Sequence, residues 1–144
     1  MTPTVEFANP ALRPVPYTRF ATPGWSVQRF ADFWSAPSAD DVPPLVTDDV
    51  VGWWAGADQP VRGVEDYTQA LADLLKLLPD IRLSVAEHAT NGDVVFVRWI
   101  MRATGLKGPF ELSGIDRIRL RDGRVCENVI RFDTQHLKRL AGFE

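Results

Sequence analysis

The spacing of hydrophobic residues changes about halfway along this chain. Between residues 26 and 78 they recur every three or four positions in several segments, as in amphipathic helices. From residue 81 onward they alternate with polar residues, which predicts β-strands with one buried face. Helices followed by an antiparallel meander are typical of an α+β domain.

The elements follow from this change of period and from the residues that interrupt it. Helical spacing predicts helices at 26–35, 38–46 and 64–78. Alternation predicts strands at 47–54, 81–90, 93–104, 110–121 and 124–132. Asn91-Gly92 is typical of a two-residue hairpin turn, and Asp133 is a good N-cap for a last helix at 134–140. A sheet of about four to six strands must bury one face against the helices, and if it curls it forms a cone with an open pocket.

The N-terminal segment differs from the rest. Residues 1–24 hold five prolines, which disfavour helix, so we expect an extended arm here and a single domain over residues 25–144. No apolar run reaches the roughly 20 residues of a membrane span, and no basic flank precedes an apolar segment at the N-terminus. We therefore expect a cytoplasmic protein without a membrane partner.

The residue composition limits the partners, cofactors and metal sites that the chain is expected to have. A net charge of −3 gives no indication of a nucleic-acid partner. The single cysteine, Cys126, excludes an internal disulfide, and two histidines, His88 and His136, do not suggest a metal centre. There is no phosphate loop or dinucleotide fingerprint, so we expect no metal and no cofactor. Five tryptophans and eight phenylalanines could line an apolar pocket or an interface.

The order of elements resembles the nuclear-transport-factor-2-like superfamily, and the local sequence resembles its SnoaL-like (polyketide cyclase) branch. The matching pieces, spread from about residue 26 to 140, are FWSAPSADDVPPLVTDDVV, RGVEDY, LPDIRLSV, NGDVVFVRWIMRATG and GIDRIRLRDGRVCENVIRFD. The resemblance implies a cone-shaped α+β barrel, with N-terminal helices packed on a curved, mostly antiparallel sheet. It also implies a hydrophobic small-molecule ligand, and relatives include ketosteroid isomerases and limonene epoxide hydrolases. The resemblance and an apolar outer face of the strands together suggest a homodimer.

Asp116 is the main catalytic candidate. It matches the position of the acid/base aspartate in SnoaL-like cyclases, which close a ring by an intramolecular aldol step. Independently of the family, alternation places one carboxylate among apolar residues and three arginines on the opposite face: Asp116, Ile118 and Leu120 on one side, Arg117, Arg119 and Arg121 on the other. A carboxylate in an apolar cavity gains basicity by desolvation. The alternative is a buried structural ion pair with an arginine.

Arg98 lies in the apolar run VVFVRWIM, where an arginine needs a carboxylate or an anionic ligand. It resembles the arginine of the Asp-Arg-Asp arrangement in limonene-epoxide-hydrolase-type enzymes. The two carboxylate positions are Ile100 and Ile130 here, so that mechanism is disfavoured. Arg98 could pair with Asp116 or orient a ligand oxygen. The alternative is a surface charge on the outer face, because Val95, Val97 and Trp99 make the opposite face the more apolar one. Considered by itself, Trp99 is expected on the outer face, where proteins of this fold often dimerise.

Asn128 is the third catalytic candidate, and its position depends on the turn at Asp122-Gly123. A three-residue turn with glycine in the left-handed conformation places Asp116 opposite Asn128. A two-residue turn places Asp116 opposite Val129 instead. We favour the three-residue turn because it leaves Ile130 facing the core.

The candidate substrate-binding residues are mostly aromatic. They are Trp34, Trp53, Trp54, Tyr67, Ile100 and Ile130. Tyr67 could donate a hydrogen bond to a substrate carbonyl, or it could be a core residue with a satisfied hydroxyl.

Two functions stay open. The first is a cofactor-free enzyme that performs aldol cyclisation or isomerisation next to a carbonyl of a polyketide- or steroid-like ligand, with Asp116 as the acid/base group. The second is a non-catalytic protein that binds a hydrophobic small molecule, with Asp116 neutralised by Arg98.

Overall fold

The computed structural model describes residues 24–143, so the arm expected before Gly24 lies outside the described residues. The helical elements are α1 (Val27–Ser35), α2 (Val64–Leu77), α3 (Thr134–Ala141) and two 3₁₀ turns, η3 (Ala39–Asp41) and η4 (Pro43–Leu45). The strands are β1 (Val46–Trp53), β2 (Val61–Arg62), β3 (Arg82–Asn91), β4 (Val94–Gly105), β5 (Gly108–Arg121) and β6 (Arg124–Arg131). The predicted long strands and the helices predicted at 26–35, 64–78 and 134–140 are therefore present.

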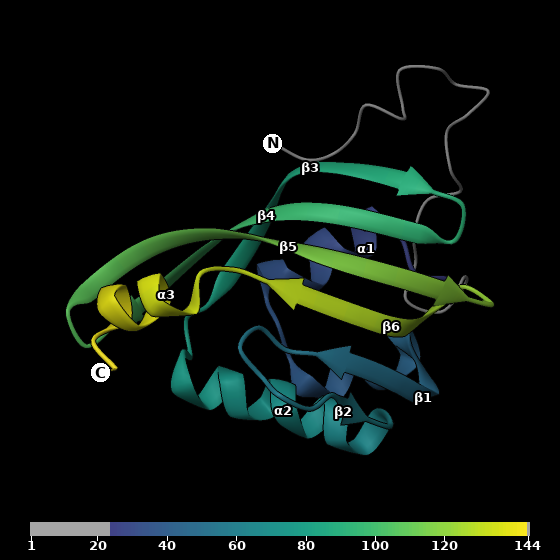
Figure 1. The fold of residues 1–144 in the computed structure, drawn as a ribbon, viewed down its shortest axis with the longest axis horizontal. Coiled ribbons are helices and arrows are strands. Elements are labelled where there is room, and N and C mark those ends of the chain that lie inside the picture. Colours follow the sequence, from purple (N-terminus) through teal and green to yellow (C-terminus); the bar gives the residue numbers. More distant parts are fainter. Residues whose placement is uncertain (1–23, 144) are drawn as a thin grey trace.

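The strands form one curved sheet in the order β2-β1-β6-β5-β4-β3 (Figure 1). Among these strands β1 and β6 pair in parallel, and the other neighbours are antiparallel. Helix α1 packs against β3, α2 against β1, and α3 against β4 and β5. This arrangement confirms the predicted α+β fold with helices on a curved, mostly antiparallel sheet.

Local sequence explains where the helices begin. The Ser26 hydroxyl accepts a hydrogen bond from the backbone N–H of Arg29, and the Asp133 carboxylate accepts one from His136. Both are N-caps, and the cap at Asp133 confirms the prediction. The single helix predicted at 38–46 is wrong, because Pro43 and Pro44 cannot donate backbone hydrogen bonds and two 3₁₀ turns form instead.

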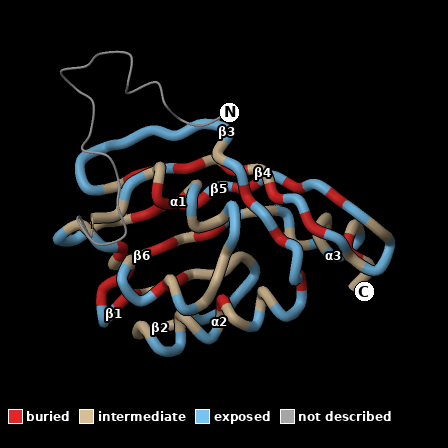
Figure 2. Tube along the Cα trace, turned by 180° about the vertical axis from the view of Figure 1, so that it is seen from behind, coloured by how far each residue is buried: buried red, intermediate tan, exposed pale blue. Residues whose placement is uncertain are grey.

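Burial alternates along the central strands, as Figure 2 shows for β4 and β5. The inward residues of β4 are Val95, Val97, Trp99, Met101 and Ala103. They face the core between the sheet and helices α1 and α2, to which the helices and the segment after α2 contribute Phe30, Leu71 and Leu78. The first hairpin turns one residue later than predicted, at Gly92-Asp93, since Asn91 still pairs with Val94.

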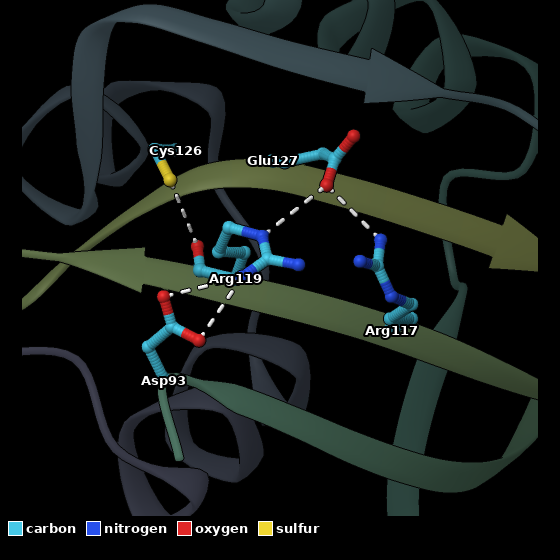
Figure 3. A network of polar contacts seen from close by, with 5 residues as sticks. All are labelled: Asp93, Arg117, Arg119, Cys126 and Glu127. Carbon is cyan, nitrogen blue, oxygen red and sulfur yellow. Dashed lines mark hydrogen bonds and ion pairs between the residues drawn. The ribbon is translucent and has the colours of Figure 1, made fainter. Parts of the chain in front are cut away.

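The hairpin of β5 and β6 corrects the predicted register. Asp122 and Gly123 both have positive φ (54° and 77°), as in a two-residue type I′ turn, and Arg121 pairs with Arg124. A bulge follows, because Leu120 pairs with Val125 while Arg119 pairs with Glu127, which leaves Cys126 as the extra residue (Figure 3).

This bulge decides which side chains share a face. A two-residue turn alone would have placed Asp116 opposite Val129, but the extra residue shifts the pairing so that Asp116 lies opposite Ile130. The predicted pairing of Asp116 with Asn128 is therefore wrong by two residues. A shift of two keeps every side chain on its face, so Asp116, Asn128 and Ile130 all still point inward.

Candidate functional site

Asp116 lies on the inner face of β5 with only 7% of its surface exposed. The indole N–H of Trp99 donates a hydrogen bond to its Oδ1 (2.8 Å), and the amide of Asn128 donates one to its Oδ2 (3.1 Å). Within residues 24–143 no arginine, lysine or histidine forms an ion pair with it. The carboxylate is thus held by two neutral donors.

This environment shifts the acidity of Asp116 upward. Burial raises its pKa from 3.8 to about 6, because the charged form loses its hydration. The hydrogen bonds from Trp99 and Asn128 act in the opposite direction, since they stabilise the carboxylate, but burial has the larger effect. The result is a buried acid that titrates near neutral pH.

Tyr67 extends the hydrogen-bonded chain. Its hydroxyl, from α2, donates to Oδ1 of Asn128 at 2.8 Å, and the amide of Asn128 donates onward to Asp116. Burial raises the pKa of Tyr67, and the negative charge of Asp116 raises it further, so the phenol stays protonated. Three side chains, from α2, β6 and β5, therefore form one hydrogen-bonded chain that ends at a carboxylate.

An apolar cavity of about 150 Å³ lies beside this chain and is partly open to solvent. Asp116, Asn128 and Tyr67 provide the polar part of its wall, and the rest comes from the helices and the concave face of the sheet. Its aromatic lining includes Trp25, Phe30, Phe33, Trp34, Trp54, Trp99 and Phe132. Such a cavity favours an apolar, ring-containing ligand that meets few polar groups.

Trp54 contributes an unusual group to this wall. Its ring stacks on Tyr67, with centroids 5.9 Å apart. Its indole nitrogen is buried and has no hydrogen-bond partner among the described residues. A buried donor without a partner is unfavourable, but this nitrogen has almost no exposed surface, so an acceptor on a ligand would reach it only after the indole ring turned toward the cavity.

Six of the nine predicted site residues line the cavity. They are Asp116, Asn128, Trp34, Trp54, Tyr67 and Ile130. The other three, Arg98, Trp53 and Ile100, do not line it. Ile100 pairs with Ser84 and Ser113, and like Trp53 it follows the alternation onto the outer face of the sheet.

Of the interpretations left open for Arg98, pairing with Asp116 is wrong, and the structure agrees with the alternative of a surface charge. Arg98 lies on the outer face, where its Nε donates to Glu87 at 2.6 Å and its side chain is 43% exposed. The inward positions around it belong to Val97 and Trp99. Because Arg98 and Ile100 both point outward, neither corresponds to an interior residue of the Asp-Arg-Asp arrangement.

Trp99 is the site residue that the sequence assigned to the wrong face. It is 2% exposed and binds Asp116 directly. The run VVFVRWIM is apolar on both of its faces, so alternation alone does not say which face is inside. The charge of Arg98 was the usable signal, since a residue that must reach water places its neighbour Trp99 in the core.

The outer face carries the features on which the expected homodimer depends. Phe96 (42% exposed) and Ile115 (44% exposed) are large apolar side chains there. A single chain does not test the assembly, so the homodimer stays a prediction. In the part of the chain that the structure describes, no helix is long and apolar enough to cross a membrane. Within the same residues no cluster of three or more metal-binding side chains occurs.

Comparison with known families and proteins agrees with this geometry. A family model described as a SnoaL-like domain matches residues 27–128. None of the curated proteins compared with the chain matches it.

Several solved structures share the fold. A proposed SnoaL-like polyketide cyclase from Jannaschia sp. CCS1 has a TM-score of 0.72 and 21% identity, over 82% of this chain and 90% of that one. A ketosteroid isomerase-like fold protein from Catenulispora acidiphila has a TM-score of 0.72 and 15% identity, over 81% and 91%. IdmH, a proposed polyketide cyclase from Streptomyces antibioticus, has a TM-score of 0.68 and 21% identity, over 81% and 95%. At these identities the likeness establishes the fold alone.

Proposed function

This chain belongs to the SnoaL-like domain family, and we propose that it is a cofactor-free enzyme whose Asp116 transfers a proton next to a carbonyl of an apolar ring compound. The observation that carries the proposal is a buried carboxylate that borders an apolar cavity and accepts hydrogen bonds from two neutral donors. A structural ion pair, the alternative drawn from the sequence, would need a cation at this place.

The acidity of Asp116 suits a general base. With a pKa of about 6, most of the side chain is ionised at pH 7, yet it is more basic than an ordinary aspartate. It would remove a proton from the carbon next to a carbonyl and later return one. Return to a different carbon gives isomerisation, and attack of the enolate on a second carbonyl before return gives aldol cyclisation.

The carbonyl oxygen needs a donor while negative charge develops on it. Trp54 follows Trp53, which pairs with Val129, so it lies level with Ile130, the partner of Asp116. The backbones of Trp54 and Asp116 are two strand spacings apart, about 10 Å. If the indole of Trp54 turned so that its buried N–H faced the cavity, a flat ligand between them could present its carbonyl to that N–H and its acidic C–H to Asp116.

Cavity size limits the ligand. A dry cavity of this size accommodates a single benzene-sized ring. A polyketide- or steroid-like compound would therefore extend through the open side of the cavity or displace aromatic side chains such as Trp34. The names of structural neighbours, which include proposed polyketide cyclases, support that ligand class.

The alternative function is a binding protein for a hydrophobic small molecule. The observation in its favour is the strongly apolar wall of the cavity, in which the polar side chains Tyr67, Asn128 and Asp116 already hydrogen-bond to one another. One of the features expected for it, neutralisation of Asp116 by Arg98, is missing, since Arg98 pairs with Glu87.

Asp116→Asn, assayed on a panel of polyketide- and steroid-like ketones, tests the proposal. Loss of a general base typically lowers turnover about 10²- to 10⁴-fold, while binding, followed by tryptophan fluorescence, should persist. Asp49→Asn is the matched control, because Asp49 is exposed on the surface and is not part of the cavity lining. Unchanged turnover of an accepted substrate by Asp116→Asn would remove Asp116 from the mechanism, and binding without turnover by the wild type would favour the binding protein.

A further inference from the structure

Two glycines of the inner face lie directly beneath the aromatic donors of the site. Gly114 is in β5 and Gly52 is in β1. Neither has a positive φ, so backbone conformation does not require glycine at either position. Glycine weakens a strand because it adds backbone entropy and no packing, and its presence here therefore needs another reason.

Gly114 makes room for Trp99. The two residues are a cross-strand pair, and a Cβ atom on Gly114 would lie 2.4 and 2.5 Å from Cη2 and Cζ2 of the indole. It would also lie 2.8 Å from the carbonyl oxygen of Arg131. Real Cβ atoms do not approach this closely, so any side chain would push the indole away from its place. That place is the one from which its N–H reaches Asp116.

Gly52 makes room for Tyr67 in the same way. A Cβ atom on Gly52 would lie 2.8 and 2.9 Å from Cε1 and Cδ1 of the phenol ring. Gly52 pairs with Asn128 across the parallel strands, so the ring lies against β1 beside the amide that its hydroxyl binds. Both glycines therefore border the hydrogen-bonded chain that ends at Asp116.

We propose that Gly114 and Gly52 are positioning residues of the site, since each leaves room on the sheet for an aromatic donor that fixes the carboxylate of Asp116. Trp99 acts directly on one oxygen, and Tyr67 acts through Asn128 on the other. The inference rests on the proposed acid/base role of Asp116. It adds that the orientation and acidity of this group are set by two residues that have no side chain.

Gly114→Ala is the sharpest test. Displacement of Trp99 removes a hydrogen bond that favours the carboxylate, so the pKa of Asp116 should rise by roughly one pH unit. Carbon-13 NMR of the Asp116 carboxyl group measures this without substrate, and the indole N–H resonance of Trp99 should move with it. For a general base with an initial pKa of about 6, turnover should fall roughly fivefold at pH 6 and recover by pH 8.

Two further variants separate positioning from a purely structural effect. Trp99→Phe lacks the indole ring atoms that clash with a Cβ at position 114, so Gly114→Ala should destabilise the Trp99→Phe protein less than it destabilises the wild type. The pKa of Asp116 should be raised in Trp99→Phe and in the double variant, because both lack the indole donor. Gly52→Ala should raise the pKa of Asp116 less than Gly114→Ala does, because Tyr67 acts on Asp116 only through Asn128. Gly24→Ala is the control, since its Cβ would meet no atom within 4 Å.

The outcomes distinguish this inference from the proposed function. A raised pKa in Gly114→Ala supports positioning even if no protein of the series turns over any ketone, in which case only the proposed function fails. An unchanged pKa and an unmoved Trp99 resonance overturn the inference whatever the activity. If Gly114→Ala does not fold, the Gly52→Ala variant carries the same measurement at the second glycine.

Discussion

Carboxylates on the two faces of the sheet around strand β5 have different kinds of partner. On the outer face Glu127 lies between Arg117 and Arg119, 3.0 Å and 3.7 Å from their guanidinium nitrogens, and Arg119 also binds Asp93 (Figure 3). On the inner face Asp116 has two neutral donors and, among the described residues, no cation as a partner. The same sheet thus pairs its outer acids with arginines and holds its inner acid with neutral groups.

The difference shows where basicity comes from. Asp49, exposed on β1, has a pKa below its usual value because the Thr47 hydroxyl and then the guanidinium of Arg121 stabilise its charge. Burial has the reverse effect on Asp116 and brings its pKa to about 6. Strand β5 carries three arginines that could have neutralised Asp116, but the alternation of side chains places all three on the outer face.

The largest expected effect is on the pH dependence of stability. The pKa of Asp116 is about 6 in the folded protein and 3.8 in an unstructured chain, so between these pH values the folded state keeps a proton that the unfolded state releases. Its contribution is therefore fully present below pH 4 and is lost as pH rises through 6, by about 3 kcal/mol. Asp116→Asn cannot ionise, so it should gain stability over the wild type as pH rises from 4 to 7.5.

Urea unfolding at pH 4 and 7.5 measures this difference. Asp49→Asn, compared with the wild type at pH 3 and 7.5, should show the opposite pH dependence of stability. The stabilising charge of Asp49 is present above pH 4 and is lost as pH falls, so its removal should matter more at pH 7.5 than at pH 3. Equal pH dependence of the wild type and Asp116→Asn would mean that Asp116 is not desolvated, and the contrast between the two faces would disappear.

Alternation predicted the strands and the inward position of Asp116 because burial of one face imposes a period of two. It could not predict the bulge at Cys126, since a two-residue turn with a bulge and a three-residue turn place the same side chains inward. The error of two residues therefore left Asp116 and Asn128 on the same face. Their hydrogen bond runs diagonally, with Asn128 paired to Ile118 and not to Asp116.

Site residues were predicted less well where both faces of a strand are apolar. In VVFVRWIM the outer Phe96 and Ile100 are as hydrophobic as the inner Val97 and Met101, so the pattern did not place Trp99 inside. The same holds for Trp53 and Trp54, of which only Trp54 lines the cavity. The hydrogen bond of Trp99 to Asp116 joins residues 17 apart in sequence, and pairing across strands created it.

Removal of the Tyr67 hydroxyl is expected to have an intermediate effect on stability. Tyr67→Phe leaves the buried oxygen of Asn128 without its donor, which should destabilise the protein by about 1–3 kcal/mol. Thr104→Val is the exposed counterpart, because its hydroxyl donates to Asp80 at the surface, where water replaces it, and the loss should stay below about 1 kcal/mol. Thermal unfolding of both variants compares them, and equal losses would contradict the difference in burial.

The smallest effect is expected from Arg98, and it tests the boundary between the faces. Its bond to Glu87 is exposed, so Arg98→Gln should change stability by no more than about 1 kcal/mol, and less at high salt. Glu87→Gln should match it, and the double variant should add nothing, since both remove one ion pair. Because the sheet separates Arg98 from the cavity, Arg98→Gln should leave the carboxyl titration of Asp116 unchanged. A shift in that titration would show that the outer charges reach the buried carboxylate.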